Sequence, residues 1–220
     1  TTPVKDEFRT RELTWIGGNE TTETIHRENN CQLRVDLSKT YFSSRLQFER
    51  MRIAGLVKFG EVIVNMFSGV GSFSIVVAKF ARPSKVYSID INPYAVKYLT
   101  KNVELNRVEG TVVPILGDAR EIIDSSLLNT ADRVLMPLPE KVFDYLGVAI
   151  SALGKNGGYI HPYDFVHAIK NEDPLSKFVN KLTEKLDVFN VSFSFSGGRV
   201  VRSVGPNWHQ VVLDIRVLKY

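Results

Sequence analysis

The chain has 220 residues, of which 44% are apolar and 24% are charged, a composition typical of a globular domain that can bury a sizeable core. Its one cysteine, Cys31, excludes an intramolecular disulfide framework and a metal site built from several cysteines. We expect no metal site and a packing role for Cys31. No apolar run reaches the ~20 residues of a membrane span, and the start at Thr1 does not resemble a signal peptide. The sequence predicts a trimmed, monomeric, cytoplasmic chain without membrane contacts.

The net charge of +4 permits an anionic partner without requiring one. Within 39–58, Glu49 is the one acid among five basic residues, and aromatic side chains alternate with them. The basic residues are Lys39, Arg45, Arg50, Arg52 and Lys58, and the aromatic ones are Tyr41, Phe42 and Phe48. This mixture is typical of a nucleic-acid surface, although an amphipathic helix with a solvated cationic side gives the same composition.

The predicted elements fall into two regions. Residues 1–40 are polar, with short strands at 22–28 and 32–37, and 44–58 has the pattern of a helix. From residue 61, strands and helices alternate. We predict strands at 61–67, 84–91, 111–116, 131–138 and 157–165, helices at 72–80, 93–106, 140–153 and 175–186, and final strands at 188–196 and 208–219 divided by the turn-like segment SGGRVVRSVGPN.

This alternation predicts an α/β fold with a doubly wound, mostly parallel seven-stranded sheet and an antiparallel edge strand. We expect residues 1–42 to form a small N-terminal α+β region and 43–220 to form the main domain.

A glycine-rich loop, Phe67-Ser68-Gly69-Val70-Gly71, follows the first strand of the alternating region. At that place a loop and a helix N-terminus can hold a ligand, although a plain tight turn has the same glycines. Asp90 ends the next strand, and Gly117-Asp118-Ala119 follows the third. Ser74 stands where a dinucleotide fingerprint requires its third glycine, and no phosphate-binding lysine follows the loop. The combination favours the S-adenosylmethionine pocket of a class I (Rossmann-like) methyltransferase.

Several further segments resemble one family: RTREL, ETIHRENN, VDLSKTYFSSRLQFER, NMFSGVGSFSI, YSIDINPYAVKYLTKNVELN, VVPILGDAREI, DRVLMPLPE, GGYIHPYDF and WHQVVLDIRV. The chain is similar over nearly its whole length to the archaeal and eukaryotic tRNA (guanine-37-N1)-methyltransferases and their wyosine-pathway relatives. The resemblance implies S-adenosylmethionine as cofactor, the tRNA anticodon stem-loop as partner, and a small tRNA-docking domain that precedes this part in the family.

Methylation at guanine N1 requires removal of the N1 proton and stabilisation of charge on O6. The resemblance implies that Glu49 is the general base and that Arg9 holds O6, with Arg11 in its place if the alignment is shifted. Glu49 as a surface ion-pair partner and Arg9 as a phosphate contact are the structural alternatives. Tyr41 is expected to stack beside an extruded base. Phe42, Arg45 and Arg52 complete the expected RNA-contacting set.

The cofactor-binding residues implied by the resemblance are Phe67, Ser68, Gly69, Val70, Gly71, Asp90, Ile91, Asn92, Asp118, Ala119 and Met136. His161 and Tyr163 are expected to shape the pocket.

Two positions depart from the family pattern. Asn65 replaces an aspartate before the glycine loop, and Pro137 stands where an asparagine is usual beside the target base. Pro137 has no hydrogen-bonding side chain, which suggests a broader pocket that also accepts the tricyclic wyosine precursor. Two other functions stay open: transfer of the aminocarboxypropyl group of the same cofactor, and RNA binding without catalysis.

Overall fold

Two compact units make up the computed structural model, which describes residues 7–219; residues 1–6 of the predicted N-terminal region lie outside that range. The first unit comprises Thr1–Gly60 and Ser68–Asp118, and the second comprises Glu61–Phe67 and Ala119–Tyr220. Seven strands are ordered β5-β4-β3-β6-β7-β9-β8 in one mixed sheet, and two more form a separate hairpin. The predicted α/β class and the antiparallel edge are confirmed. The boundary expected at residue 43 stays a prediction.

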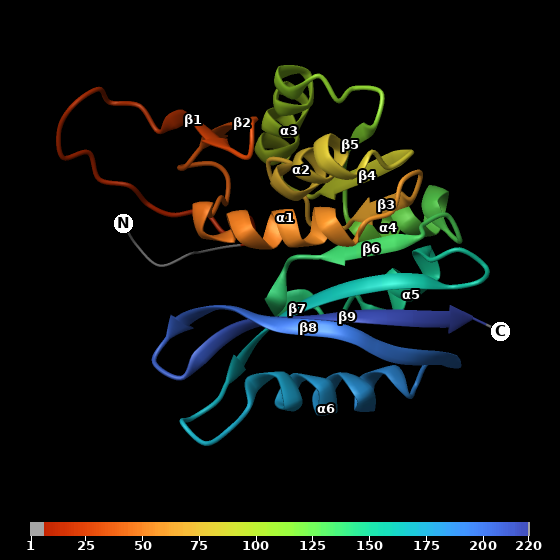
Figure 1. Cartoon of the computed structure of the whole chain (residues 1–220). Helices are drawn as coiled ribbons and strands as arrows, with labels where there is room; N and C mark the ends of the chain where they lie inside the picture. Colours follow the sequence, from red (N-terminus) through yellow and green to blue (C-terminus); the bar gives the residue numbers. More distant parts are fainter. Residues whose placement is uncertain (1–6, 220) are drawn as a thin grey trace. The chain divides into compact units, whose positions relative to one another are not determined.

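In the first unit, β4 (Lys85–Asp90) and β5 (Val112–Leu116) pair in parallel, with Asp90 opposite Leu116 at their carboxyl ends. Three helices accompany them: α1 (Gln47–Leu56), preceded by a 3₁₀ turn at Ser44–Leu46, α2 (Ser72–Ala81) and α3 (Pro93–Asn106). Helix α1 packs along α2, as Figure 1 shows. Helix α3 begins at Asn92-Pro93, where the asparagine side chain accepts from two backbone N–H groups of the first turn.

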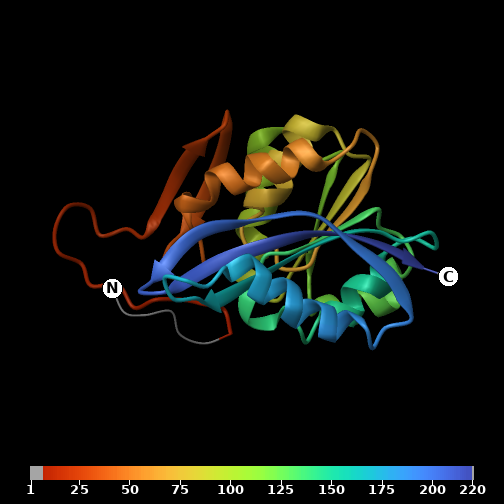
Figure 2. The same ribbon diagram turned by 60° about the horizontal axis from the view of Figure 1, so that its bottom comes forward.

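A β-hairpin of β1 (Glu23–Glu28) and β2 (Cys31–Asp36) lies against α3 in the first unit (Figure 2). Side chains of α3 pair with the backbone of β2 as a neighbouring strand would. The Asn106 amide accepts from Gln32 N and donates to Gln32 O, and the Asn102 amide does the same for Arg34. The i, i+4 spacing on the helix thus matches the i, i+2 spacing on the strand. Cys31 is buried here, as predicted.

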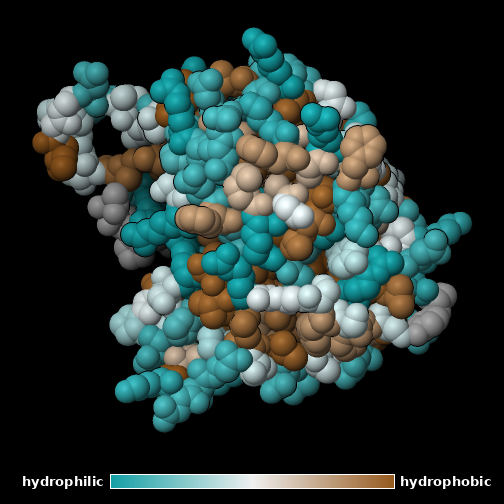
Figure 3. All heavy atoms as spheres, viewed as in Figure 1, coloured by the Kyte–Doolittle hydropathy of each residue, from teal (hydrophilic) through white to brown (hydrophobic). Residues whose placement is uncertain are grey.

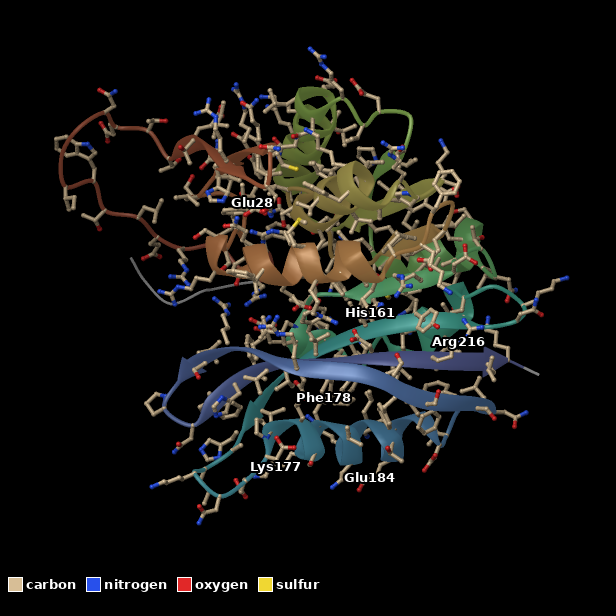
Figure 4. The ribbon with its side chains drawn as sticks, viewed as in Figure 1. Glu28, His161, Lys177, Phe178, Glu184 and Arg216 are labelled. Atoms are coloured by element: carbon tan, nitrogen blue, oxygen red, sulfur yellow. The ribbon has the colours of Figure 1, made fainter. Side chains whose placement is uncertain are left out.

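In the second unit, β3 (Val62–Asn65), β6 (Arg133–Met136) and β7 (Gly158–His167) are parallel, and β9 (Trp208–Lys219) and β8 (Val191–Gly205) continue the sheet in antiparallel pairing. Helices α5 (Leu146–Ala152) and α6 (Pro174–Leu186) pack on these strands. Figure 4 shows Phe178 between α6 and the strands, with Lys177 and Glu184 on the helix's outer side. Figure 3 shows apolar side chains on the visible surface where β8 and β9 run.

Three predicted segments differ from the structure. The helix expected over 140–153 is a 3₁₀ turn (Pro139–Lys141) followed by the shorter α5, because the first turns use i to i−3 hydrogen bonds. Most of the segment expected to separate the last two strands is instead part of β8, which absorbs extra residues as bulges, and only Pro206 and Asn207 form the turn. A short helix, α4 (Ala119–Ile122), continues into one π-helical turn (Ile123–Leu127) that was not predicted. Among the described residues, no helix is long and apolar enough to cross a membrane.

Candidate active site

Asp90 organises the glycine loop of the first unit. One carboxylate oxygen accepts from Gly69 N at 2.6 Å and the other from Asn92 N at 3.0 Å. Burial raises the pKa of Asp90 although both backbone bonds favour its ionised form. Each carboxylate oxygen offers two lone pairs, so each can still accept a hydrogen bond from a ligand hydroxyl.

Two glycines of the loop have left-handed backbone, and they serve different purposes. Gly71 has φ +87°, and a Cβ there would lie 2.3 Å from Leu99 Cδ1, so this glycine allows helix α2 to approach α3. Gly69 has φ +54°, and an added Cβ would meet only Tyr41 O, at 3.8 Å. The space beside Gly69 is therefore open for a ligand to approach the backbone.

Ser68 gives the second sign that the loop holds a ligand. Its hydroxyl is buried and has no hydrogen-bond partner in the part of the chain that the structure describes. A buried hydroxyl is normally bonded, so this oxygen can be satisfied by a polar group entering the loop. Together with the open side of Gly69 and the Asp90 carboxylate, it fits a cofactor that carries hydroxyl and amino groups.

Asp118 and Ile91 lie at the same edge of the β4–β5 pair. Gly117 N donates to Asp90 O at 3.1 Å, which ties the carboxyl end of β4 to the turn before Asp118. Ile91, just after β4, is 39% exposed and can offer an apolar surface to a ligand. Val70 differs, because its side chain packs into the core with Val35. Only the backbone of Val70 can contribute to a ligand site.

Asn92 connects the loop with the segment that carries Tyr41. Its side-chain oxygen caps α3, and its side-chain nitrogen donates to Lys39 O at 2.8 Å. Tyr41 O in turn lies beside Gly69. A continuous path of hydrogen bonds and short peptide segments therefore runs from Asp90 to Tyr41 within the first unit.

Arg9 lies over the ring of Tyr41, with the guanidinium carbon 4.2 Å from the ring centroid. A planar cation on an aromatic face is a stable stacking arrangement. The structure thus brings together two residues that are 32 positions apart and that were both assigned to the base-binding region. Arg9 has φ +57°, the left-handed region that a non-glycine residue adopts at a structural cost.

Glu49 is buried on α1, where the Arg52 Nη2 donates to it at 2.8 Å and Arg52 Nε lies about equally close to both oxygens, at 3.0 and 3.1 Å. Glu49 is therefore not exposed, but the ion pair that the structural alternative expects is present, and its role as general base stays a prediction. The neighbouring Arg50 is also buried and is held by Glu28 through two hydrogen bonds of 2.5 Å. Arg50 therefore stabilises the core. Of the five basic residues in the segment 39–58, it cannot contribute to the predicted cationic surface.

Comparison with known proteins places this geometry in a family. The TRM5/TYW2 methyltransferase domain model matches residues 24–191. The chain belongs to the TRM5/TYW2 family. The resemblance predicted from the motifs is confirmed.

The family relatives are similar over almost the whole chain. The tRNA (guanine(37)-N(1))-methyltransferase Trm5b of Pyrococcus abyssi is 44% identical over 97% of this chain and 61% of the relative. The tRNA 4-demethylwyosine(37)-methyltransferase Taw21 of Saccharolobus solfataricus is 41% identical over 97% of this chain and 76% of the relative. A crystal structure of M. jannaschii TYW2 in complex with AdoMet is 31% identical, with a TM-score of 0.83 over 94% of this chain and 90% of that chain. The chain spans about three fifths of the length of the Pyrococcus relative.

The remaining residues predicted to contact RNA differ in their surroundings. Arg45 is exposed at the start of the helical segment. Phe42 is partly buried against the cluster that contains Val70, and its ring lies 5.0 Å from that of His26. These packing contacts explain the position of the Phe42 side chain without RNA. Its predicted contact with RNA stays a prediction. Arg52 is 21% exposed in its side chain and pairs with Glu49.

The other four predicted site residues belong to the second unit of this TRM5/TYW2 domain. Met136 is buried at the end of β6, and Pro137 follows it, half-buried. The ring of Phe67, just beyond β3, meets Tyr145 edge-on at 5.1 Å. Ala119 is buried at the start of α4. The roles predicted for these four residues stay predictions.

A buried polar chain in the second unit was missed by the sequence reasoning. Arg133 donates to both carboxylate oxygens of Glu61, at 2.7 and 2.9 Å, and lies 2.6 Å from His161 Nε2, while His161 Nδ1 lies 2.6 Å from Asp214. His161, labelled in Figure 4, is fully buried, and its expected role in shaping the pocket stays a prediction. An arginine within the apolar strand ADRVLM was the available signal, because a buried guanidinium requires partners.

Proposed function

We propose that this chain carries the S-adenosylmethionine-dependent catalytic part of a tRNA (guanine-37-N1)-methyltransferase, acting as a monomer in the cytoplasm. The observation that carries the proposal is the junction in the first unit between the glycine loop and the segment bearing Tyr41 and Arg9. The names of the two relatives, Trm5b and Taw21, support both the methyl transfer and the tRNA substrate.

The loop residues fit the cofactor. The Asp90 carboxylate would accept from the ribose hydroxyls, the Ser68 hydroxyl would bond a polar group of the ligand, and the backbone at Gly69 would allow close approach. The AdoMet complex of the TYW2 structure supports this choice of ligand. When bound, the cofactor supplies an electrophilic methyl group.

Tyr41, Arg9 and Glu49 would handle the base. Tyr41 would stack on the extruded guanine, and the Arg9 guanidinium would donate to O6, where negative charge accumulates. The Glu49 carboxylate would take the N1 proton, since N1 is a poor nucleophile while protonated. Arg52 would hold that carboxylate in one orientation.

Pro137 leaves the substrate range wider than plain guanine. The relative Taw21 is named for methylating 4-demethylwyosine, and it matches this chain at 41% identity. We propose that the tricyclic precursor is accepted as a second substrate, because a proline after β6 imposes no hydrogen-bond pattern on the base.

Nucleoside mass spectrometry tests the function. Wild-type protein is incubated with isotopically methyl-labelled cofactor and tRNA carrying either guanosine or the tricyclic precursor at position 37. A methyl mass increment on the purine at position 37 is expected with both. The larger increment of an aminocarboxypropyl group would assign the alternative transfer. Binding of cofactor and tRNA without any increment would identify a non-catalytic relative.

A further inference from the structure

Helix α1 of the first unit has the reverse of the usual polarity of a surface helix. Such a helix normally buries apolar side chains and turns charged side chains to solvent. On α1, the charged residues Glu49 and Arg50 are buried, whereas Phe48 is 84% exposed. All ten residues of α1 are described, and its exposed positions, Gln47, Phe48, Gly55 and Leu56, carry no charge. The outer side of α1 therefore lacks the polar cover that a surface in contact with water alone is expected to have.

Neighbouring apolar side chains continue this outer side. Phe59, three residues beyond Leu56, is 85% exposed, and Phe80 in the last turn of α2 is also exposed. Gly60 N donates to Arg82 O at 3.2 Å, which ties the segment that carries Phe59 to the end of α2. Figure 3 shows brown and tan spheres among teal ones on the surface over α1 and α2. We call the surface formed by Phe48, Gly55, Leu56, Phe59 and Phe80 the apolar face.

Two glycines keep the backbone of the apolar face accessible. A Cβ added at Gly55 or at Gly60 would have nothing within 4 Å beyond its own local chain. Gly60 has φ +80°, a backbone conformation that favours glycine, but Gly55 lies inside a helix, where glycine is a poor helix former. The absence of a side chain at Gly55 allows another chain to approach the helix backbone closely beside Leu56.

The charges around the end of the apolar face are positive. Lys58 and Arg82 are exposed there, and Arg45 is exposed just before α1. From residue 50 to 89 the sequence contains one acid, Glu61, and Arg133 donates to both of its carboxylate oxygens. A partner that covers the apolar face without charge repulsion therefore has to combine apolar side chains with negative charge.

This combination favours a protein partner over RNA. An apolar centre with a charged rim is the usual anatomy of a protein–protein interface. An RNA surface instead needs cations along the phosphates and flat groups for the bases, and Gly55 and Leu56 supply neither. A second copy of the chain, related by a two-fold axis, would bring the same cations against one another. The charge pattern thus favours a different protein over self-association.

We propose that the apolar face binds another protein through an amphipathic helix whose apolar stripe is flanked by aspartate and glutamate. The inference is independent of the proposed function. The ten residues of α1 span about 15 Å, which corresponds to roughly three turns of a partner helix. Phe48 and Phe59 would pack against the apolar stripe of that helix, and Lys58 and Arg82 would pair with its carboxylates.

Binding of two synthetic helical peptides to the 220-residue chain tests the proposal. Both peptides have about 18 residues with Leu and Phe at i, i+3, i+4 and i+7 spacing, and the flanking positions are Glu in one and Lys in the other. The Glu peptide should bind, and the Lys peptide should bind at least about tenfold more weakly. Phe48→Ser/Leu56→Ser should weaken binding of the Glu peptide at least about tenfold, because the apolar area that both side chains bury is lost. Lys58→Glu/Arg82→Glu should also weaken it and reduce its dependence on salt.

The matched controls lie on α3. Leu105 is exposed to nearly the same extent as Leu56, so Leu105→Ser removes a comparable apolar group. Lys97→Glu/Lys101→Glu reverses two exposed cations, as Lys58→Glu/Arg82→Glu does. Both controls should bind the Glu peptide like wild type. The melting temperature of every variant should match wild type, because the replaced side chains are exposed.

The proposal is overturned if the Glu peptide does not bind the wild-type chain, or if the variants of the apolar face bind it as the controls do. Binding of an unmodified tRNA transcript and sedimentation velocity are measured on the same variants. Weaker tRNA binding by Phe48→Ser/Leu56→Ser would assign the apolar face to RNA. A wild-type dimer that dissociates in this variant would assign the face to a second copy, and either result would overturn the proposal.

Discussion

Glu49→Gln is the sharpest test of the catalytic assignment. The substitution keeps the shape of a side chain that is only 2% exposed and removes its ability to take a proton. We expect the methyl-transfer step to slow by ~10²–10⁴-fold, the usual contribution of a positioned general base. The fold should lose only about 1 kcal/mol, because Arg52 is part-exposed and water can replace its lost partner.

The assay is single-turnover methylation at saturating cofactor and tRNA across pH, which separates chemistry from binding. Solvent base can take the N1 proton at higher pH, so the rate of the Gln variant should rise with pH and approach that of wild type. Cofactor affinity should be unchanged. Arg52→Gln is the matched control, since it breaks the same ion pair and retains the carboxylate.

The control decides between a base and a structural ion pair. A base predicts that Arg52→Gln, which keeps the carboxylate but loses the group that orients it, retains more of the single-turnover rate than Glu49→Gln does. If the two variants lose the same rate, and the double variant loses no more than either, Glu49 contributes only through Arg52. A Glu49→Gln enzyme that is fast at neutral pH would also refute the reasoning.

Three further predictions follow from the first unit. Acidification through the raised pKa of Asp90 should weaken cofactor binding about tenfold per pH unit, because the hydrogen bonds to the ribose need the carboxylate. The same raised pKa makes the contribution of Asp90 to folding stability greatest below pH ~3.8 and smaller as the pH rises through the pKa of the folded state. Calorimetry on Asp90→Asn should show a cofactor affinity that does not change with pH. Glu28→Ala should lower stability by ~3–5 kcal/mol in urea melts, because it leaves the Arg50 charge buried alone; a loss under 1 kcal/mol would contradict this. Asn92→Ser keeps the helix cap and removes the hydrogen bond to Lys39 O. The free energy of unfolding should fall by about 1 kcal/mol, and turnover should fall more than cofactor affinity. Equal effects on turnover and affinity would reject a positioning role for Asn92.

The alternating part of the chain could be predicted because its signals are local. Helix α3 begins at Asn92-Pro93 and ends at Asn106, as the sequence indicates, since a cap, a proline and apolar periodicity agree there. The parallel strands are short apolar runs bounded by turn residues, and each was predicted to within a few residues. The glycine loop and Asp90 could be identified for the same reason, because the loop comes just after β3 and Asp90 is the last residue of β4.

The features that escaped prediction depend on contacts between distant residues. Nothing local in the segment SGGRVVRSVGPN indicates that Gly198 lies so close to β9 that a Cβ would meet Leu213 Cδ2 at 2.7 Å. That close approach lets a turn-like composition continue as a strand. Likewise, the sequence gives the same weight to Arg50 and Arg45, and only the position of Glu28 on β1 separates the buried arginine from the exposed one.

The asparagines of α3 explain why the N-terminal segment belongs with the cofactor loop. Asn102 and Asn106 satisfy the backbone of β2, while Asn92 binds the backbone at Lys39. Asn102 also donates to Val70 O, inside the glycine loop. One helix therefore supports the hairpin, the segment leading to Tyr41, and the loop proposed to bind the cofactor. Because buried backbone groups are costly when unpaired, these three parts are stable in this arrangement only together. The same amide groups that complete the fold thereby fix the proposed base-stacking residue relative to the proposed cofactor loop.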